Sequence, residues 1–502
     1  MTGRDRVQDS YDRVPYPSVL QHHTHPDHLA VLALLHGLEP VPAAQCRVLE
    51  LGCADGGNLI PMAIELPESR FTGVDLSPRQ IEAGRAEVAA LGLTNVDLRA
   101  QSILDVDESL GTFDYVICHG VFSWVEEAVQ EQILAICRRH LAPQGIAYIS
   151  YNTFPGWHQR RMLRDMVLYH TRGIDDPEQQ TARAFELVRF LADAAANDND
   201  VHAAVMRAAR DHFEGYADYP QYMLHEYLEA TNAPIYFHEM AARAASHGLQ
   251  YVAEAEPAVA EVDNLSADVA RKLRSFAGDR IELEQYLDFV LNRTFRRTLF
   301  THKEIVIDRA MRAERMQRLF VSTATKPTED GGFITERGRT FSSMHPVAHA
   351  VLTMLASAAP RAVPFGNLPA DAVLADLLYS LYWSGVIDLH MMPPQCVNSV
   401  SAYPRATPLA RRQAAAGLLV TNQRRRALKL DDPIARFLLL QLDGTRSHAT
   451  LLQLLDREVA TGRLDISVDG KPIREPHRIP AVLQAVLDHH LRRMAELALL
   501  VG

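Results

Sequence analysis

The chain has 502 residues, of which 47% are apolar and 23% charged, the composition of an ordinary globular protein with two or three domains. Its net charge of −11 argues against binding nucleic acid through a broad basic surface, and no eighteen uncharged apolar residues follow one another to span a membrane. The five cysteines lack Cys-x-x-Cys spacing, and no apolar run follows the first residues, so we expect a bacterial-style cytoplasmic protein without disulfides or a signal peptide.

The N-terminal segment contains Tyr16 between two prolines, where a regular helix cannot form. Such a segment either closes over a bound ligand as a lid or packs as an irregular arm. Four histidines follow it: His22, His23, His25 and His28. Their spacing matches no standard zinc pattern, so we expect them to cap a helix or brace a turn, and we expect no metal.

Residues 47–51 predict a buried strand that runs into a glycine-rich turn, residues 52–57. Glycine allows the backbone to approach a ligand closely because it has no Cβ atom. Neither Cys53 nor Ala54 supplies the middle glycine that a dinucleotide pyrophosphate would need. Glu50 stands just before the turn, one residue away from it, and its carboxylate suits a cationic ligand better than a phosphate.

From residue 45 to 150, strands and helices alternate, which predicts a doubly wound parallel sheet of the Rossmann type. The second strand ends at Asp75, about twenty residues after the turn, where an acid binds ribose hydroxyls. Together with Glu50, this favours a nucleoside without phosphates, namely S-adenosylmethionine. The other expected elements are strands at 96–99, 114–118 and 145–150, helices at 78–91 and 125–141, and a turn at 141–145.

Residues 160–325 lose the short strands and show helical periodicity, which predicts a helical middle domain. The expected helices are 160–170, 181–196, 201–213, 222–228, 236–247 and 283–298.

A linker marked by proline and glycine, Lys326–Gly332, opens the third region. Its first expected helices are 346–358 and 371–384. A helix–turn–helix pattern in the part beyond Gly417 predicts a winged-helix-like half in a mainly α C-terminal domain. We expect an interaction or dimerisation module rather than a DNA-binding one, because the chain is acidic and has a single basic run, Arg424–Arg426.

The predicted donor site lies at the ends of the strands. Glu50 and the turn would face the methionyl part, with backbone N–H groups for its carboxylate. Asp75 would bind the ribose, and Ser102 the edge of the adenine. The expected cofactor-binding residues are Glu50, Gly52, Cys53, Gly56, Asp75, Leu76, Ser102, Ile103 and His119.

Residues 50–56 and Val74–Asp75 resemble the first two motifs of class I S-adenosylmethionine-dependent methyltransferases, and Phe113–His119 resembles their fourth-strand motif. Ser102 stands where these enzymes often have an acid. Further segments resemble the members that carry a methyltransferase regulatory domain, such as the rickettsial outer-membrane-protein lysine methyltransferases. These segments are 11–17, 24–29, 151–158, 233–239 and 247–251. The resemblance implies methylation of lysine side chains in a protein, and a homodimer formed through the middle region.

The acceptor side must align the amine with the donor methyl group and exclude water. We expect His119 to orient the acceptor and Trp124 either to wall the methyl pocket or to pack in the core. The expected catalytic residues are His119, Tyr151, Asn152 and Trp157, and the expected substrate-binding residues are Tyr16, Trp124 and His158. Aromatic rings after the fifth strand would hold a lysine stem and its ammonium, although the same residues also suit a rigid turn.

The sequence thus predicts a methyltransferase domain at 1–160, a middle domain at 161–325 and a C-terminal domain at 326–502. Two alternatives remain open. One is a methyltransferase for a small molecule or a modified peptide in secondary metabolism, which would need a closed pocket rather than an open groove. The other is a scaffold that no longer reacts, which the missing middle glycine favours and the intact Glu50 and Asp75 oppose.

Overall fold

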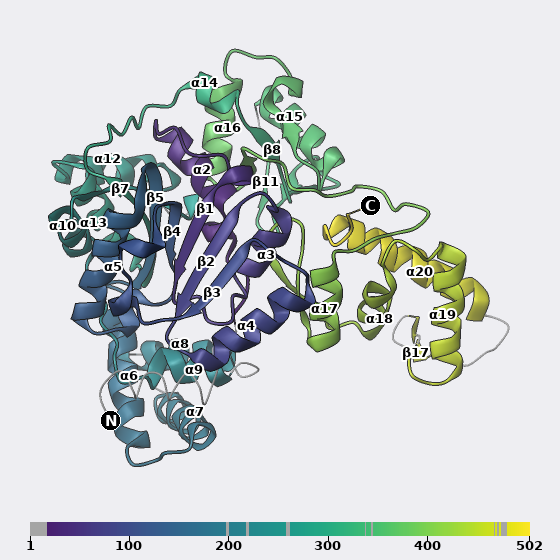
Figure 1. Cartoon of the computed structure of the whole chain (residues 1–502), viewed down its shortest axis with the longest axis horizontal. Helices are drawn as coiled ribbons and strands as arrows, with labels where there is room; N and C mark the ends of the chain where they lie inside the picture. The colour runs from purple at the N-terminus through teal and green to yellow at the C-terminus, as the bar shows by residue number, and fades with distance from the viewer. Residues whose placement is uncertain are drawn as a thin grey trace.

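A computed structural model describes most of the chain (Figure 1). The described residues are 18–196, 200–216, 220–257, 262–336, 338–342, 345–465, 467–468, 471–472 and 479–501. Tyr16, expected at the substrate site, lies outside them. Among the described helices, none combines the length and the apolar character needed to cross a bilayer.

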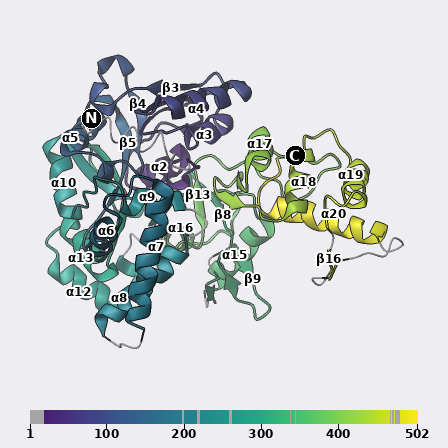
Figure 2. The ribbon, with the colours of Figure 1, turned by 90° about the horizontal axis from the view of Figure 1, so that it is seen from below.

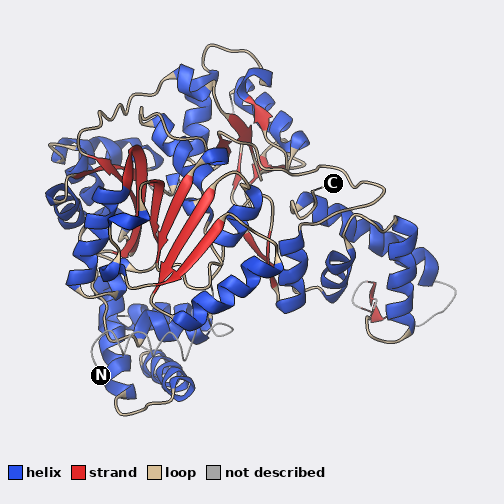
Figure 3. Cartoon of the chain, viewed as in Figure 1, coloured by secondary structure: helices blue, strands red, loops and turns tan. Residues whose placement is uncertain are grey.

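A seven-stranded sheet in the order β3-β2-β1-β4-β5-β7-β6 forms the centre of the molecule (Figure 3). Its strands are β1 Arg47–Leu51, β2 Arg70–Asp75, β3 Val96–Ala100, β4 Phe113–Cys118, β5 Leu141–Asn152, β6 Leu249–Glu254 and β7 Phe295–His302. β1 to β5 pair in parallel, and β7 runs antiparallel to both β5 and β6. The strand order reverses between β1 and β4, which makes their carboxyl ends the expected ligand edge. The predicted doubly wound α/β fold is confirmed.

Helices cover both faces of this sheet. α2 and α3 pack on one face with Val48, Ile117 and Tyr148, and α5 and α10 pack on the other with Leu49 and Val116. The helices that flank the first five strands are α2 Pro26–Leu35, α3 Leu59–Glu65, α4 Pro78–Ala90 and α5 Glu127–His140. Single-turn 3-10 helices lie at His22–Thr24, Ala43–Gln45, Ile103–Asp105, Glu108–Leu110, Phe122–Trp124, Val262–Asn264 and Phe365–Asn367.

The middle region contains helices and also the last two strands of the sheet. Its helices are α6 Trp157–Thr171, α7 Pro177–Ala194, α8 Val201–Glu214, α9 Pro220–Tyr227, α10 Phe237–Ser246, α12 Ala267–Phe276 and α13 Arg280–Leu291. α6 to α9 share one apolar core and form a bundle below the sheet in Figure 1, on the side where β5 leads into α6. β6 and β7 join the sheet beside β5, so the predicted boundary at residue 160 does not coincide with its edge.

Two predicted elements differ from the structure. The helix expected at 283–298 ends at Leu291, because Asn292 adopts a left-handed backbone conformation (φ +46°) that terminates the helix before β7 begins. The turn expected at 141–145 belongs to β5 instead. Leu141 pairs with Phe113 across an irregular register and is buried, so the strand continues through this segment.

The C-terminal region forms two parts. The first contains α14 Ala313–Met316, α15 Pro346–Ala358 and α16 Leu374–Trp383, with strands β8 Phe320–Ser322, β9 Lys326–Pro327, β10 Phe333–Ile334, β11 Thr340–Phe341, β12 Val363–Pro364 and β13 Asp388–His390. The second contains α17 Pro408–Ala416, β14 Leu419–Thr421, β15 Ala427–Lys429, α18 Pro433–Gln441, α19 His448–Ala460, β16 Ser467–Val468, β17 Lys471–Pro472 and α20 Ile479–Glu496. It has its own apolar core and forms a separate lobe in Figures 1 and 2. The winged-helix-like half is confirmed.

A buried arginine joins β7 to β6 and α13. The Arg296 side chain is 0% exposed and donates to Glu254 at 3.0 Å, to Glu284 at 2.9 Å and to Asp288 at 2.8 and 2.9 Å. Its guanidinium also lies 3.8 Å from the ring centroid of Phe237. A charge buried at this depth is tolerated because every carboxylate around it is paired.

We predict that Arg296→Ala lowers the free energy of unfolding by about 3–5 kcal/mol, because it removes the one cation that contacts all three buried carboxylates and leaves them to Arg293 and Arg280 alone. Urea unfolding followed by tryptophan fluorescence measures this change. The matched control is Arg271→Ala, whose ion pair with Asp268 joins side chains that are 76% and 88% exposed, and which we expect to change stability by less than about 0.5 kcal/mol. Equal effects of the two substitutions would contradict the prediction.

Candidate active site

The glycine-rich turn after β1 has an unusual backbone. Gly52 and Gly56 have φ angles of +76° and +78°, and a Cβ atom on Gly52 would lie 2.4 Å from Cγ2 of Val121. Ala54 takes the middle position and is itself left-handed, with φ +51°. An alanine pays about 1–2 kcal/mol for this conformation, and it is the smallest residue after glycine. The turn therefore forms without the middle glycine that dinucleotide-binding turns use.

Most of the amides in this turn are already engaged. Five of them donate hydrogen bonds of 2.8 to 3.1 Å within the fold, those of Gly52, Cys53, Ala54, Gly56 and Gly57. The sequence-based expectation that they bind the donor carboxylate is therefore not supported. Cys53 can offer only its backbone to a ligand, because its sulfur packs against Gly73 of β2. A Cβ atom added to Gly73 would lie 2.6 Å from that sulfur.

Glu50, at the carboxyl end of β1, carries a buried oxygen without a partner. Its side chain is 3% exposed, and Oε1 accepts a hydrogen bond of 2.7 Å from Asn58, whereas Oε2 has no hydrogen-bond partner within the described structure. Burial raises the pKa of Glu50 to about 8. A buried carboxyl with a free oxygen fits an incoming ammonium group, which would restore its ionised form. The α-amino group of S-adenosylmethionine meets this requirement.

The other predicted donor residues also lie at the carboxyl ends of strands. Asp75 is half-buried at the end of β2, where Oδ1 accepts from Ser77 N at 2.8 Å and Oδ2 from Ala54 N at 2.9 Å. These bonds fix the carboxylate at the ligand edge of the sheet, at the place predicted for binding ribose hydroxyls. Leu76 follows Asp75 and is half-buried.

Ser102 follows β3, the third strand in the chain. Its side chain is 8% exposed, and Oγ accepts from Leu104 N at 3.2 Å, which caps the 3-10 turn that starts at the half-buried Ile103. The Ser102 hydroxyl therefore has a structural role in this turn. Its contact with the adenine edge stays a prediction.

His119, directly after β4, faces a polar group of β5 side chains. Its Nδ1 lies 3.0 Å from the Tyr148 hydroxyl and 3.3 Å from Oγ of Ser150. Burial, reinforced by the charge of Arg297, lowers the pKa of His119 to about 3. The imidazole is therefore neutral at physiological pH and suited to orienting a substrate rather than to taking up its proton.

Asn152 lies on the same face of β5 as Tyr148 and Ser150, because side chains alternate along a strand. It is 2% exposed, and its Nδ2 has no hydrogen-bond partner in the described part of the chain. Phe295 of β7 is in register with Asn152 of β5. Its ring centroid lies 6.3 Å from that of His119.

Arg297 lies two residues further along β7, in register with Ser150 of β5. Its side chain forms an ion pair with Glu256. Phe295, Arg297, Tyr148 and Ser150 were not predicted. Tyr148 and Ser150 could have been predicted, because they alternate with Asn152 along the expected strand. No local sequence pattern assigned Phe295 and Arg297 to a strand.

The structure does not bring the other predicted acceptor residues to His119. Tyr151 lies on the opposite face of β5, 1% exposed, with its hydroxyl 2.9 Å from Thr298 Oγ1. Trp157 is completely buried, and its ring centroid lies 6.2 Å from that of the half-buried Trp124. These contacts make Tyr151 and Trp157 parts of the core, and we do not retain them as catalytic residues.

His158 is exposed on the outer side of α6. Its ring stacks on Phe154 at 4.2 Å, and its Nε2 lies 3.1 Å from the Tyr236 hydroxyl. Among the N-terminal histidines, His25 caps α2 by accepting from Asp27 N at 3.1 Å. Within the described ranges, no three His, Cys, Asp or Glu side chains are grouped to hold a metal ion.

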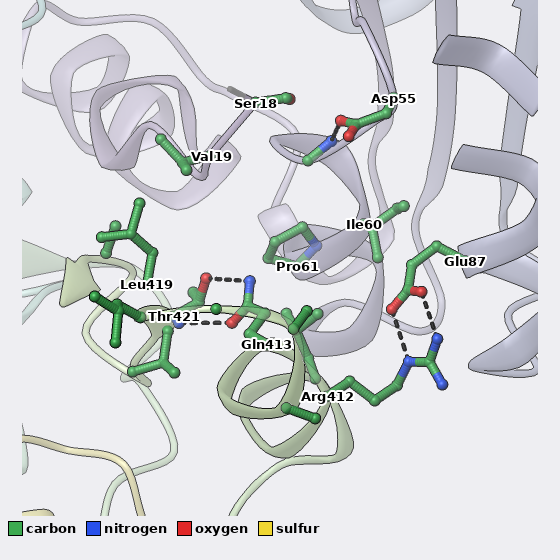
Figure 4. Close-up of a pocket in the computed structure, with 18 of the residues that line it drawn as sticks. Ser18, Val19, Asp55, Ile60, Pro61, Glu87, Arg412, Gln413, Leu419 and Thr421 are labelled. Carbon is green, nitrogen blue, oxygen red and sulfur yellow. Dashed lines mark hydrogen bonds and ion pairs between the residues drawn. The ribbon is translucent and has the colours of Figure 1, made fainter. Parts of the chain in front are cut away.

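A cleft of about 1150 Å³ lies between the sheet domain and the winged-helix half (Figure 4). Asp55 and Gly57 of the turn line one end, and Leu409 and Leu419 line the opposite wall. His119, Asn152 and Glu50 do not line it, so the chemistry described above lies beside this cleft rather than within it.

Comparisons with known proteins agree with the fold. Three family models match: a methyltransferase domain over residues 49–147, a predicted methyltransferase regulatory domain over 219–302, and the C-terminal winged helix domain of PKMT over 402–499. The whole chain is 32% identical to the uncharacterized protein RP789 of Rickettsia prowazekii, of which it covers 95%. The structure of PKMT2 from Rickettsia typhi in complex with AdoHcy matches with a TM-score of 0.84 and 29% identity, over 97% of this chain and 100% of that chain.

We predict that affinity for S-adenosylmethionine falls by up to about tenfold for each pH unit from pH 7.5 to pH 6. In the free protein Glu50 is protonated below its pKa of about 8, so a ligand that needs the carboxylate must expel a proton, and this becomes more costly as the pH falls. Isothermal titration at several pH values measures the effect. Glu50→Gln should bind more weakly and without this pH dependence. An unchanged pH dependence in the variant would contradict the assignment.

Proposed function

Because this chain belongs to the class I S-adenosylmethionine-dependent methyltransferases that carry a methyltransferase regulatory domain, we propose that it methylates lysine side chains of a protein. S-adenosylmethionine is the methyl donor. The choice of lysine is supported by the match of residues 402–499 to the winged helix of PKMT, the abbreviation for protein lysine methyltransferase. The observation that carries the proposal is the buried side chain of Asn152, whose Nδ2 has no hydrogen-bond partner among the described residues and which lies on the same sheet face as a neutral imidazole.

The donor supplies an electrophilic methyl group bound to a sulfonium. The lysine amine attacks that carbon with its lone pair, the carbon–sulfur bond breaks, and its electron pair stays on sulfur. The acceptor must therefore arrive as a neutral amine, although the pKa of a free lysine is about 10.4. The residues of this chain have two tasks: to orient the amine and to favour its deprotonated form.

Desolvation by the walls of the site favours the neutral amine. Phe295 and the neutral His119 ring form an aromatic wall, and Arg297 adds a positive charge that disfavours a second cation nearby. The ion pair of Arg297 with Glu256 offsets part of this charge. The amide oxygen of Asn152 would accept from the amine and direct its lone pair. Glu50 would bind the donor amino group, Asp75 the ribose, and Ser102 with Ile103 the adenine.

We predict that the purified protein transfers labelled methyl groups from S-adenosylmethionine to lysine Nζ atoms of a protein, read by mass spectrometry of peptides. Asp75→Ala should lower kcat/KM by about 100-fold, because it removes two charge-assisted hydrogen bonds to the ribose. The control is Asp97→Ala, an exposed acid on β3 that pairs with Arg99 outside the site and should leave the rate within about twofold.

Label on a different residue type, or only on small molecules, would contradict lysine as the acceptor. Absence of transfer to every acceptor tried, by a folded protein that binds the donor, would contradict the enzymatic proposal itself.

A further inference from the structure

One side chain from outside β1, Asn58, holds the carboxyl group of Glu50, and a second, Thr24, holds Asn58. Asn58 Nδ2 donates to Glu50 Oε1 at 2.7 Å and lies 3.0 Å from Thr24 Oγ1. Asn58 Oδ1 accepts from Gln21 N at 2.8 Å and lies 3.2 Å from the same hydroxyl. Asn58 is 5% exposed and Thr24 is completely buried. The direction in which Glu50 presents its free oxygen is therefore set by this buried pair.

Both side chains stand at the start of a helix. Thr24 precedes α2 by two positions, and Asn58 precedes α3 directly. A displacement of either helix would therefore move one member of the pair relative to Glu50.

One arginine of the winged-helix half fastens both of these helices. Arg425 lies in the turn between β14 and β15, and its side chain is 6% exposed. Its Nη1 lies 2.6 Å from Asp27 Oδ2 on α2, and its Nη2 lies 2.7 Å from Glu65 Oε1 at the last residue of α3. A guanidinium can make two such contacts at once because its donors form a rigid fork.

Asp27 and Glu65 are both ionised in this contact. Burial alone would raise the pKa of Glu65, but the charges and hydrogen bonds of Arg425 and His25 together outweigh burial and lower that pKa to about 2. Asp27 is completely buried and also accepts from the backbone N–H groups of Met391 and Met392 at 3.0 and 2.7 Å. Both carboxylates are therefore ionised, and their cation comes from the C-terminal domain.

We propose that Asn58 and Thr24 are positioning residues for donor binding, and that the C-terminal domain keeps them in place through Arg425. This inference rests on the proposed function, because it takes Glu50 as the partner of the donor amino group. It gives the winged-helix half a role at the cofactor site: Arg425 holds α2 at the same end as Thr24 and holds α3 at the end opposite Asn58.

The chain offers a matched control for the contact of Arg425. A second arginine of the same lobe, Arg412 on α17, forms an ion pair of 2.6 and 2.8 Å with Glu87 on α4 (Figure 4). This pair also joins the two domains, but it touches neither α2 nor α3, and its side chains are 46% and 33% exposed.

The test is isothermal titration of the full-length protein with S-adenosylmethionine from pH 6 to about pH 9.5, a range that contains a midpoint near the Glu50 pKa of about 8 and its upward shift. Asn58→Ala should weaken binding by about tenfold and move the pH midpoint upward, because a hydrogen bond to the Glu50 carboxylate is lost. Arg425→Lys keeps the charge but cannot span both acids, and it should weaken binding by about fivefold. Arg412→Ala should bind within about twofold of the unaltered protein.

If Asn58 had a merely structural role, Asn58→Ala would also raise the KM for the protein acceptor. For a positioning role, the KM for the protein acceptor at saturating donor should stay within about twofold in Asn58→Ala. Glu65→Gln releases only α3 and replaces Arg425→Lys if that variant does not fold, as judged by circular dichroism.

The outcomes separate the two proposals. If Glu50→Gln weakens binding but Asn58→Ala changes neither the affinity nor the pH midpoint, the positioning role is wrong and the donor site stands. If Arg425→Lys and Arg412→Ala behave alike, the control by the C-terminal domain is wrong. If Glu50→Gln itself binds normally, the assignment of Glu50 fails, and with it the premise of the positioning role and of the control by the C-terminal domain.

Discussion

The parallel pairing of β1 with β2 on one side and β4 on the other is the constraint on which the site depends. It brings the carboxyl ends of three strands to one edge, with Glu50 in register with Gly73 and with Ile117. Side-chain alternation then decides which residues face the ligand. The antiparallel addition of β7 places Phe295 and Arg297 on that same face beside β5. The acceptor wall is thus built from strands far apart in the chain.

The buried ionisable groups of this protein fall into two classes with different roles. Arg296 and Arg425 are buried but surrounded by carboxylates, so they hold elements together. Glu50 is equally buried but has an amide on one oxygen and no partner for the other within the described residues. Keeping such a group is costly unless a ligand completes it. The contrast separates the structural ion pairs from the acid that we assign to the donor.

Local sequence patterns were enough to predict the parts of the site that lie next to their own strand. Glu50 and Asp75 end strands whose apolar residues are visible in the sequence, and their places follow from the sheet order. Tyr151 was assigned to the acceptor although the period of two puts it on the opposite face from Asn152. Phe295 could not be found, because the residues before it read as one long helix. The contact of Arg425 with two helices more than 350 positions away has no local sign at all.

The most direct test of this account is a crystal structure of the protein with S-adenosylhomocysteine at pH 8. The account predicts the amino group of the ligand within about 2.7–3.1 Å of Glu50 Oε2, and the ribose hydroxyls on Asp75. A ligand whose amino group contacts other residues, while Glu50 Oε2 stays without a partner, would contradict it.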